Sequence, residues 1–411
     1  MTFKIVIISS GQPSLNPRLV KEADALASQG YDVTVLYAYW NDWGTHYDQQ
    51  LLAGKKWKAI RVGGDPQEKR VTWFVSRLMH KTAAYILQKT GNYRHLADFA
   101  IARSSYFLIR AAKKHKADLY IAHNLGALPA VVKVALHYKK PIGFDAEDFH
   151  RQEVTDDVNS FHYKICSHIE DKYLPSVNYV TASSPLIAER YTSLYNTSVS
   201  TILNVFPAAN RLVAPVINNN VPLKLFWFSQ TIGPNRGIEA VIQAFKLLDK
   251  ANFELHLLGN ITPEDKEEFI EQQQIEGLHI YFHDPVSPEK VVGFAAQFDI
   301  GLAAENSIPL NRDICLTNKI FTYMQAGLAI VASDTAAQEK LLGEYPAIGK
   351  IYQQGNPQSL ADILDCYRRD RNAILGARQN SLNAGQAVFN WEIESGKFLN
   401  IIENVLTAPC E

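Results

Sequence analysis

Short apolar runs alternate with amphipathic stretches along most of this sequence. In the first half, the runs predicted as strands are residues 4–9, 31–37, 57–62, 118–122, 141–144, 177–182 and 199–203. Residues 38–56 are predicted as a loop, and helices are predicted between the other runs. Strands that alternate with helices in this way form a parallel sheet with helices on both faces. A doubly wound domain is therefore expected.

The same alternation starts again near the middle of the chain. The segment LKLFWFSQTIGPNRGIE, residues 223–239, begins with an apolar, aromatic-rich run that is typical of a buried strand. Further predicted strands are residues 253–258, 279–282, 299–304 and 328–332. A chain of 411 residues is too long for one ordinary core. A second domain of the same kind is therefore predicted.

The loop that follows residue 228 has the residues expected of an anion site. Gly233, Pro234 and Gly237 provide a turn between the predicted strand and the next helix. Such a turn points backbone N–H groups and the positive end of a helix at one place, which suits a phosphate. Arg236 adds a forked cation. The alternative is an ordinary turn with a solvated arginine.

Other patterns exclude several classes of protein. The first loop, SSGQPSLN, lacks the GxGxxG pattern, and no ribose-binding acid follows the second strand, which disfavours a dinucleotide oxidoreductase. The four cysteines are scattered, which favours a reducing cytosol. We expect no signal peptide and no membrane-spanning segment, because no apolar run reaches about 18 residues. No histidine or cysteine spacing predicts a metal site.

The charge of the chain is unevenly distributed. Residues 69–116 contain eleven lysines and arginines and one acid, Asp98, although the net charge of the chain is −1. The segment includes a predicted amphipathic helix at residues 71–89. Two interpretations stay open: a helix whose apolar side faces the core, or an interfacial helix on anionic lipid. No nucleic-acid recognition motif is present, so nucleic acid is not an expected partner.

Polar residues follow the predicted strands of the first domain, where ligands of parallel sheets bind. His123 follows one strand, and His150 follows another together with Glu147 and Asp148. A lone histidine in such a loop is also a common structural residue. The acids at 145–148 are expected to be polar loop residues on the acceptor side.

Several segments together resemble glycosyltransferase family 4, also called group 1. They are FSQTIGPNRGIE, DIGLAAE, LTNKIFTYMQAGLAIVASD and FNWE, and NPRLVKEADALASQGYDVTVL resembles the opening of the same group. The resemblance covers nearly the whole chain and implies the GT-B fold, in which two Rossmann-like parallel-sheet domains face each other across a cleft. The implied divisions are an acceptor domain (1–205), a linker (206–222), a nucleotide-sugar domain (223–385) and a C-terminal helix (386–411) that packs back on the first domain.

The resemblance also implies roles for individual residues. Donor-binding candidates are Gly233, Arg236, Gly237, Gly259, Asn260, Glu305, Asn311, Arg312, Thr317, Asn318, Lys319 and Thr322. Acceptor-binding candidates are Ser10, Gly11, Asn16, Glu147 and Asp148, and catalytic candidates are His150, His123 and Asp313.

The sequence departs from the family pattern at three donor positions. Thr231 stands where the family has a second phosphate-binding cation, and Ile314 and Thr322 replace the two acids of the E-x7-E motif. Asn311, Arg312 and Asp313 are candidates to replace the missing contacts to the sugar.

The implied activity is hexosyltransferase-like. A sugar would pass from a nucleotide-diphosphate sugar to a glycan or lipid-linked acceptor, with retention and without a metal or other cofactor, in surface polysaccharide or glycoconjugate synthesis. A cytoplasmic protein, peripheral on the inner face of the membrane, is expected. The alternatives are a UDP-sugar epimerase of the same architecture and a pseudoenzyme or binding subunit.

Overall fold

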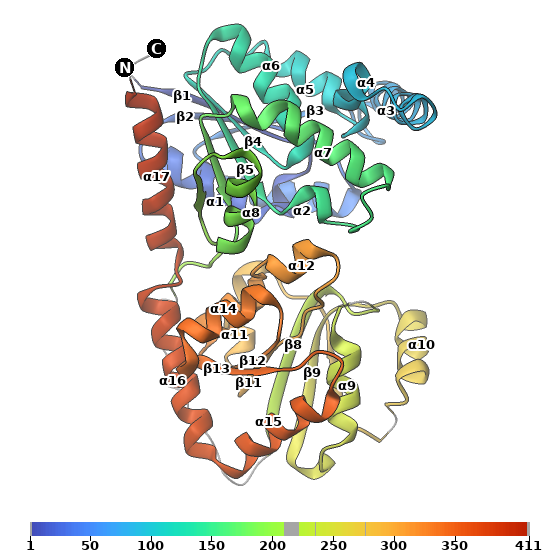
Figure 1. Cartoon of the computed structure of the whole chain (residues 1–411), viewed down its shortest axis with the longest axis vertical. Helices are drawn as coiled ribbons and strands as arrows, with labels where there is room; N and C mark the ends of the chain where they lie inside the picture. Colours follow the sequence, from blue (N-terminus) through green and yellow to red (C-terminus); the bar gives the residue numbers. More distant parts are fainter. Residues whose placement is uncertain (1, 209–221, 235, 276, 409–411) are drawn as a thin grey trace. The chain divides into compact units, whose positions relative to one another are not determined.

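The chain folds into two compact units, each built on one parallel sheet (Figure 1). The computed structural model describes residues 2–208, 222–234, 236–275 and 277–408. The first unit comprises Met1–Ile202, Pro309–Asn311 and Ser395–Glu411, and the second comprises Leu203–Ile308 and Arg312–Glu394. The expected pair of doubly wound sheets is thus confirmed. Most of the predicted linker, 206–222, lies outside the described residues.

The sheet of the first unit has the strand order β3-β2-β1-β4-β5-β6-β7. Its strands are β1 (Lys4–Ser9), β2 (Asp32–Ala38), β3 (Lys58–Val62), β4 (Leu119–His123), β5 (Ile142–Glu147), β6 (Tyr179–Ala182) and β7 (Val199–Thr201). The order reverses between β1 and β4, which pair with Ile5 opposite Leu119. Side chains at the carboxyl ends of these two strands therefore meet at a switch point, where such sheets bind ligands.

Helices cover both faces of this sheet (Figure 1). They are α1 (Pro17–Ser28), α2 (Asp42–Leu51), α3 (Arg70–Thr90), α4 (Tyr93–Ala100), α5 (Ser105–Ala112), α6 (Leu128–Tyr138), α7 (Phe161–Tyr173) and α8 (Pro185–Tyr195). The prediction of a loop at 38–56 was wrong, because α2 lies there. Asn41 caps α2 by accepting a hydrogen bond from the Gly44 N–H, with a distance of 2.7 Å.

The sheet of the second unit has the order β10-β9-β8-β11-β12-β13. Its strands are β8 (Leu223–Thr231), β9 (Phe253–Asn260), β10 (Ile280–His283), β11 (Ile300–Ala303), β12 (Ala329–Ser333) and β13 (Gly349–Tyr352). The edge strand β13 was not predicted. The order reverses between β8 and β11, so the loops after these strands lie at the switch point of this unit.

The helices of the second half follow the same alternation. They are α9 (Ile238–Lys246), α10 (Pro263–Gln273), α11 (Pro288–Ala295), α12 (Leu310–Ile314), α13 (Asn318–Ala326), α14 (Ala336–Glu344), α15 (Pro357–Arg369), α16 (Arg371–Ala387) and α17 (Trp391–Thr407). The core between sheet and helices includes the fully buried Trp227 and Phe245. From Ser395 onward, the terminal helix groups with the first unit. None of the described helices combines the length and apolar character needed to cross a bilayer.

Candidate functional site

The loop between β8 and α9 is held against the end of β11 by a glycine. Gly237 has a φ of +77°, and a Cβ added there would lie 2.5 Å from the carbonyl oxygen of Ala304. Only glycine combines this left-handed backbone with so close an approach. The first turn of α9 is therefore fixed beside the residue that follows Ala304, which is Glu305.

Glu305 holds the start of α13 close to the first turn of α9. Its Oε1 accepts hydrogen bonds from Thr317 Oγ1 at 2.9 Å and from Lys319 Nζ at 2.7 Å. Its backbone N–H donates to Ser333 Oγ at the end of β12. The N-terminal ends of α9 and α13, each the positive end of a helix dipole, are thus held in one region. The charge of Lys319 is compensated by Glu305.

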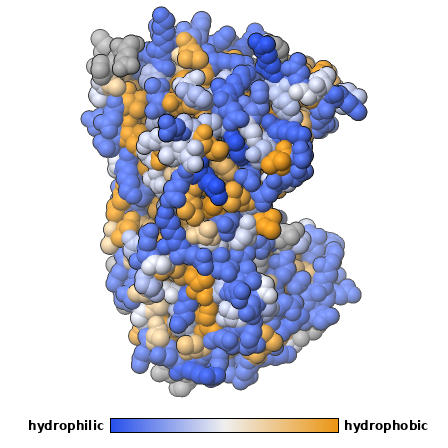
Figure 2. Space-filling view, viewed as in Figure 1, coloured by the Kyte–Doolittle hydropathy of each residue, from blue (hydrophilic) through white to orange (hydrophobic). Residues whose placement is uncertain are grey.

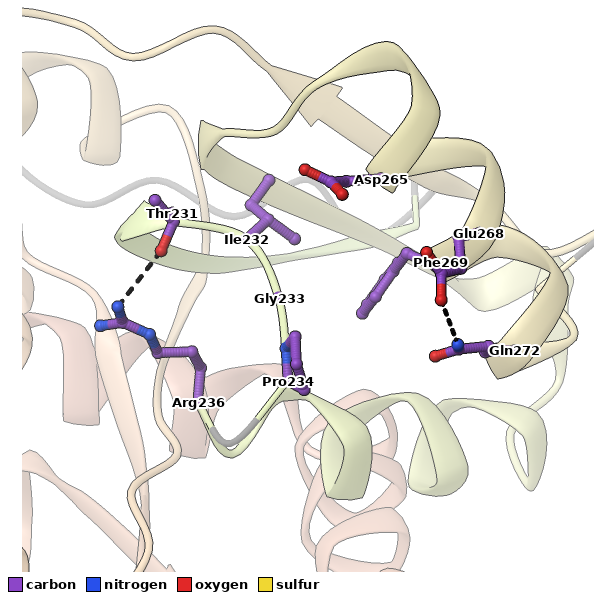
Figure 3. A pocket seen from close by; sticks show the side chains of 9 residues that line it. All are labelled: Thr231, Ile232, Gly233, Pro234, Arg236, Asp265, Glu268, Phe269 and Gln272. Carbon is purple, nitrogen blue, oxygen red and sulfur yellow. Dashed lines mark hydrogen bonds between the residues drawn. The ribbon is translucent and has the colours of Figure 1, made fainter.

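Arg236 lies on the loop before α9 and is exposed. Its guanidinium donates hydrogen bonds to Ser229 Oγ (3.4 Å) and Thr231 Oγ1 (3.2 Å), as Figure 3 shows for Thr231. Both partners are neutral hydroxyls, so they leave the positive charge uncompensated. Thr231, which replaces the second cation of the family pattern, therefore orients Arg236.

A cavity of about 450 Å³ lies beside this loop (Figure 3). One wall is formed by the loop residues Thr231, Ile232, Gly233, Pro234 and Arg236, and the other by Asp265, Glu268, Phe269 and Gln272 of α10. The carboxylates of α10 repel anions, so this cavity does not suit a diphosphate. The first turns of α9 and α13 provide the better anion site.

Other predicted donor residues shape the loops. A Cβ on Gly259 would lie 2.7 Å from the Ser229 carbonyl oxygen, and the Asn260 carbonyl accepts a hydrogen bond from the Ile232 N–H. Both residues thus set the path of the loop after β8. Asn318 begins α13, and its carbonyl accepts a hydrogen bond from Thr322 Oγ1.

Positions 314 and 322, where the family pattern has acids, are both buried. Thr322 is fully buried within α13, and Ile314 is buried as well. Among the nearby candidates, Asp313 accepts a hydrogen bond from the Ala336 N–H at 3.0 Å, in the first turn of α14. This contact gives Asp313 a structural role in the second unit. Arg312 is partly buried.

A buried cluster of charged residues connects α1 with β4 and β5 in the first unit. Arg18 Nε is 2.6 Å from Asp145 Oδ2 and 3.5 Å from Glu22 Oε1. His123 Nε2 is 2.9 Å from Glu22 Oε2, and His123 Nδ1 is 3.3 Å from Asp145 Oδ2. The expectation that the acids at 145–148 are loop residues was wrong for Asp145, which lies buried in β5, and for Glu147, which is the last residue of that strand. Arg18 and Glu22 were not predicted as members of a cluster, although their i, i+4 spacing on α1 was an available signal.

The protonation of this cluster follows from its contacts. Burial alone would lower the pKa of His123, but the carboxylates of Glu22 and Asp145 raise it. Burial would raise the pKa of Asp145, and the Arg18 guanidinium lowers it. Glu22, His123 and Asp145 bring metal-ligand atoms together, but the Arg18 cation occupies the same cluster. His123 is 0% exposed, which favours a structural role.

His150 lies in the loop after β5 and has one ring nitrogen without a hydrogen-bond partner among the described residues. Its Nδ1 is 2.8 Å from Glu153 Oε2, whereas its Nε2 is buried with no hydrogen-bond partner among the described residues. Burial would lower the pKa of His150, but the hydrogen bond and charge of Glu153 raise it to about 9. His150 is therefore an imidazolium at neutral pH, with an N–H donor that needs an acceptor.

We expect the ring of His150 to titrate near pH 9, above the ordinary value of 6.5. Because folding raises the pKa of His150, protonation of this ring stabilises the folded state. This stabilisation is complete below pH 6.5 and is lost as the pH rises through about 9. NMR titration of the histidine ring signals would measure this directly. The Glu153→Gln variant should return the pKa toward the ordinary value, and a wild-type value near 6.5 would contradict the assignment.

The neighbours of His150 form a polar loop with an unusual backbone. Glu147 has a φ of +53°, and burial together with the charge of Asp148 raises its pKa to about 7. Asp148 Oδ1 accepts a hydrogen bond from Asn311 Nδ2 at 2.9 Å, and Asn311 Oδ1 accepts one from the Phe149 N–H. Asn311, predicted to bind the donor, thus groups with the first unit and supports the His150 loop.

The remaining acceptor candidates shape the loop after β1. Ser10 Oγ donates a hydrogen bond to Asn124 Oδ1 at 3.4 Å, and the Gly11 N–H donates to Ser9 Oγ at 3.1 Å. Asn16 is buried and caps α1 by accepting from the Leu19 N–H.

Two Rossmann-like units with polar residues at the carboxyl ends of their strands define the GT-B architecture, and solved structures with this architecture match the whole chain. A complex of Anabaena Alr3699/HepE with UDP is 13% identical, with a TM-score of 0.67, over 98% of this chain and 100% of that chain. Sucrose-phosphate synthase from Thermosynechococcus elongatus is also 13% identical, with a TM-score of 0.67, over 98% and 99%. A putative UDP-N-acetylglucosamine 2-epimerase from Listeria monocytogenes is 10% identical, with a TM-score of 0.57, over 99% and 97%.

A family match covers part of the second half of the chain. Residues 222–369 match the family described as "Glycosyl transferases group 1". Most of the second unit is therefore similar to a group 1 glycosyltransferase domain, and the whole chain has the GT-B fold, as the sequence resemblance indicated. No curated protein matches the chain.

Proposed function

We propose that this chain transfers a sugar from a UDP-sugar to a glycan or lipid-linked acceptor, with retention of configuration. The uridine nucleotide is supported by the solved structures, since HepE binds UDP and UDP-glucose and a trehalose-phosphate synthase from Burkholderia xenovorans is described as UDP-forming.

The observation that supports the proposal best is the convergence of two helix N-termini beside Arg236. Gly237 fixes α9 against Ala304, and Glu305 fixes Thr317 and Lys319 of the α13 turn. When the sugar leaves, negative charge accumulates on the diphosphate. Backbone N–H groups, helix dipoles and the guanidinium can stabilise that charge in the transition state. We propose on this basis that transfer does not require a metal.

The acceptor would bind to the first unit. Glu147 ends β5, and Asp148 and His150 follow it at the carboxyl end of that strand; their carboxyl groups and the buried N–H donor of His150 suit the hydroxyl groups of a sugar. The basic segment 69–116 supports an acceptor at an anionic membrane, as in surface polysaccharide or glycoconjugate synthesis. A cytoplasmic, peripheral location would fit this acceptor.

A donor screen with the purified protein tests the proposal. UDP-, GDP- and ADP-sugars would be offered with and without glycan acceptors, and the released nucleotide would be measured before and after dialysis against EDTA. Acceptor-dependent release of UDP is expected, and NMR of the product would show its anomeric configuration. Conversion of the donor to its epimer without an acceptor would instead identify an epimerase. Calorimetry that shows no binding of UDP, GDP or ADP would contradict donor binding.

A further inference from the structure

Helix α3 turns several of its large apolar side chains away from the unit to which it belongs. The exposed fractions are 79% for Val71, 64% for Phe74, 56% for Leu78 and 62% for Tyr85. The side of α3 that is buried consists of small residues and one leucine: Ser76, Ala83 and Leu87. The interpretation of a core-facing apolar side is therefore wrong for this helix.

The exposed residues form one continuous stripe. At 3.6 residues per turn, positions 71, 74, 75, 78, 82, 85 and 86 fall within about 60° of one line along the helix. We call these residues the α3 stripe. α3 lies at one end of its unit beside α4 (Figure 1), and Figure 2 shows hydrophobic surface among hydrophilic surface in that part of the view.

Cations border the α3 stripe. α3 contains Arg70, Arg77, Lys81 and Lys89 and no acid. The first three fall on one flank, about 100° around the axis from the stripe. The guanidinium of Arg77 lies 4.6 Å from the centre of the Trp73 ring, and Lys89 Nζ lies 5.9 Å from the centre of the Tyr85 ring. This mixture of apolar, aromatic and basic side chains is typical of helices that lie in a membrane interface.

We infer that α3 docks the first unit on an anionic lipid bilayer, with the α3 stripe inserted between the lipids and the flanking cations at the head groups. This inference specifies the peripheral location proposed above. The charge of the helix favours lipid over a second copy of the chain. In a symmetric dimer the same patch would face itself, which would bring four cations of each copy together without an acid on either helix.

Vesicle co-sedimentation with the full chain tests the inference without any enzymatic readout. The wild type is expected to bind mixed vesicles of phosphatidylglycerol and phosphatidylcholine much more tightly than vesicles of phosphatidylcholine alone. This binding should weaken as the salt concentration rises. The variant Arg77→Glu/Lys81→Glu/Lys89→Glu should bind the anionic vesicles at least about a hundredfold more weakly. The variant Phe74→Ser/Leu78→Ser/Tyr85→Ser should also lose binding.

The chain offers a matched control in the exposed residues after α5. The variant Lys113→Glu/Lys114→Glu/Lys116→Glu makes the same change of charge in the same basic segment, away from the α3 stripe, and should keep most of the binding. An equal loss in this control would overturn the inference. Failure of the wild type to bind anionic vesicles, or a dimer in solution that the serine variant dissociates, would overturn it too. A donor screen that fails would leave these measurements unaffected.

Discussion

Replacing Arg18 with methionine is expected to lower the free energy of unfolding of the first unit by about 3–5 kcal/mol, the usual effect of removing one partner of a buried ion pair. Arg18 is fully buried and forms two hydrogen bonds with Asp145, at 2.6 and 2.7 Å. Methionine fills similar space but leaves the charges of Asp145 and Glu22 without the guanidinium. The unpaired carboxylates would then destabilise β5, which contains Asp145, and α1, which contains Glu22.

Hydrogen exchange of the amides in β4 and β5 would measure this loss, because two units can unfold in separate steps and a single melting curve would mix them. Arg190→Met provides the control, since Arg190 is exposed on α8 of the same unit. Protection in β4 and β5 that changes by less than about 1 kcal/mol in Arg18→Met would contradict a structural role for the cluster.

Replacing Arg236 with alanine is expected to weaken the binding of UDP by about 1.5–3 kcal/mol, which is roughly 10- to 150-fold in Kd. The guanidinium already contacts Ser229 and Thr231, so it is oriented before the nucleotide arrives. Its charge-assisted hydrogen bond to the diphosphate would disappear in the variant. Arg236→Lys should lie between the wild type and alanine, because it keeps the charge but not the planar fork.

Calorimetric titration with UDP measures the effect, with Arg369→Ala as the control on the exposed end of α15. Arg236 contacts only hydroxyl groups in the described structure, so its removal should leave the fold intact. Unchanged affinity in Arg236→Ala would remove the loop before α9 from the nucleotide site.

The sequence predicted those features that depend on neighbouring residues. The strand, glycine loop and helix at residues 223–239 were correct because β8, Gly237 and α9 follow one another in the chain. The contacts between distant segments were not predictable in this way. Arg18 and Asp145 are 127 positions apart, and Asn311 and Asp148 are 163 apart. Only the folded sheet brings such residues together.

One local prediction failed and another was left open, for different physical reasons. α2 was missed because Gly44, Thr45 and the aromatic residues in its sequence have low helix propensity, although Asn41 at its N-cap was an available signal. The orientation of α3 was left open because a stripe of apolar residues does not show which side of a helix meets the core. The structure decides it, because α3 packs beside α4 with the small residues Ser76 and Ala83 buried, while most of the large side chains are exposed.

The backbone at Glu147 carries a conformational cost that other residues would avoid. A left-handed conformation costs a residue with a side chain about 1–2 kcal/mol, and glycine or asparagine would avoid much of that cost. Replacing Glu147 with either residue would therefore relieve the backbone, but it would also remove a carboxyl group that we propose for the acceptor site. Stability and the proposed activity thus make opposite demands on this position.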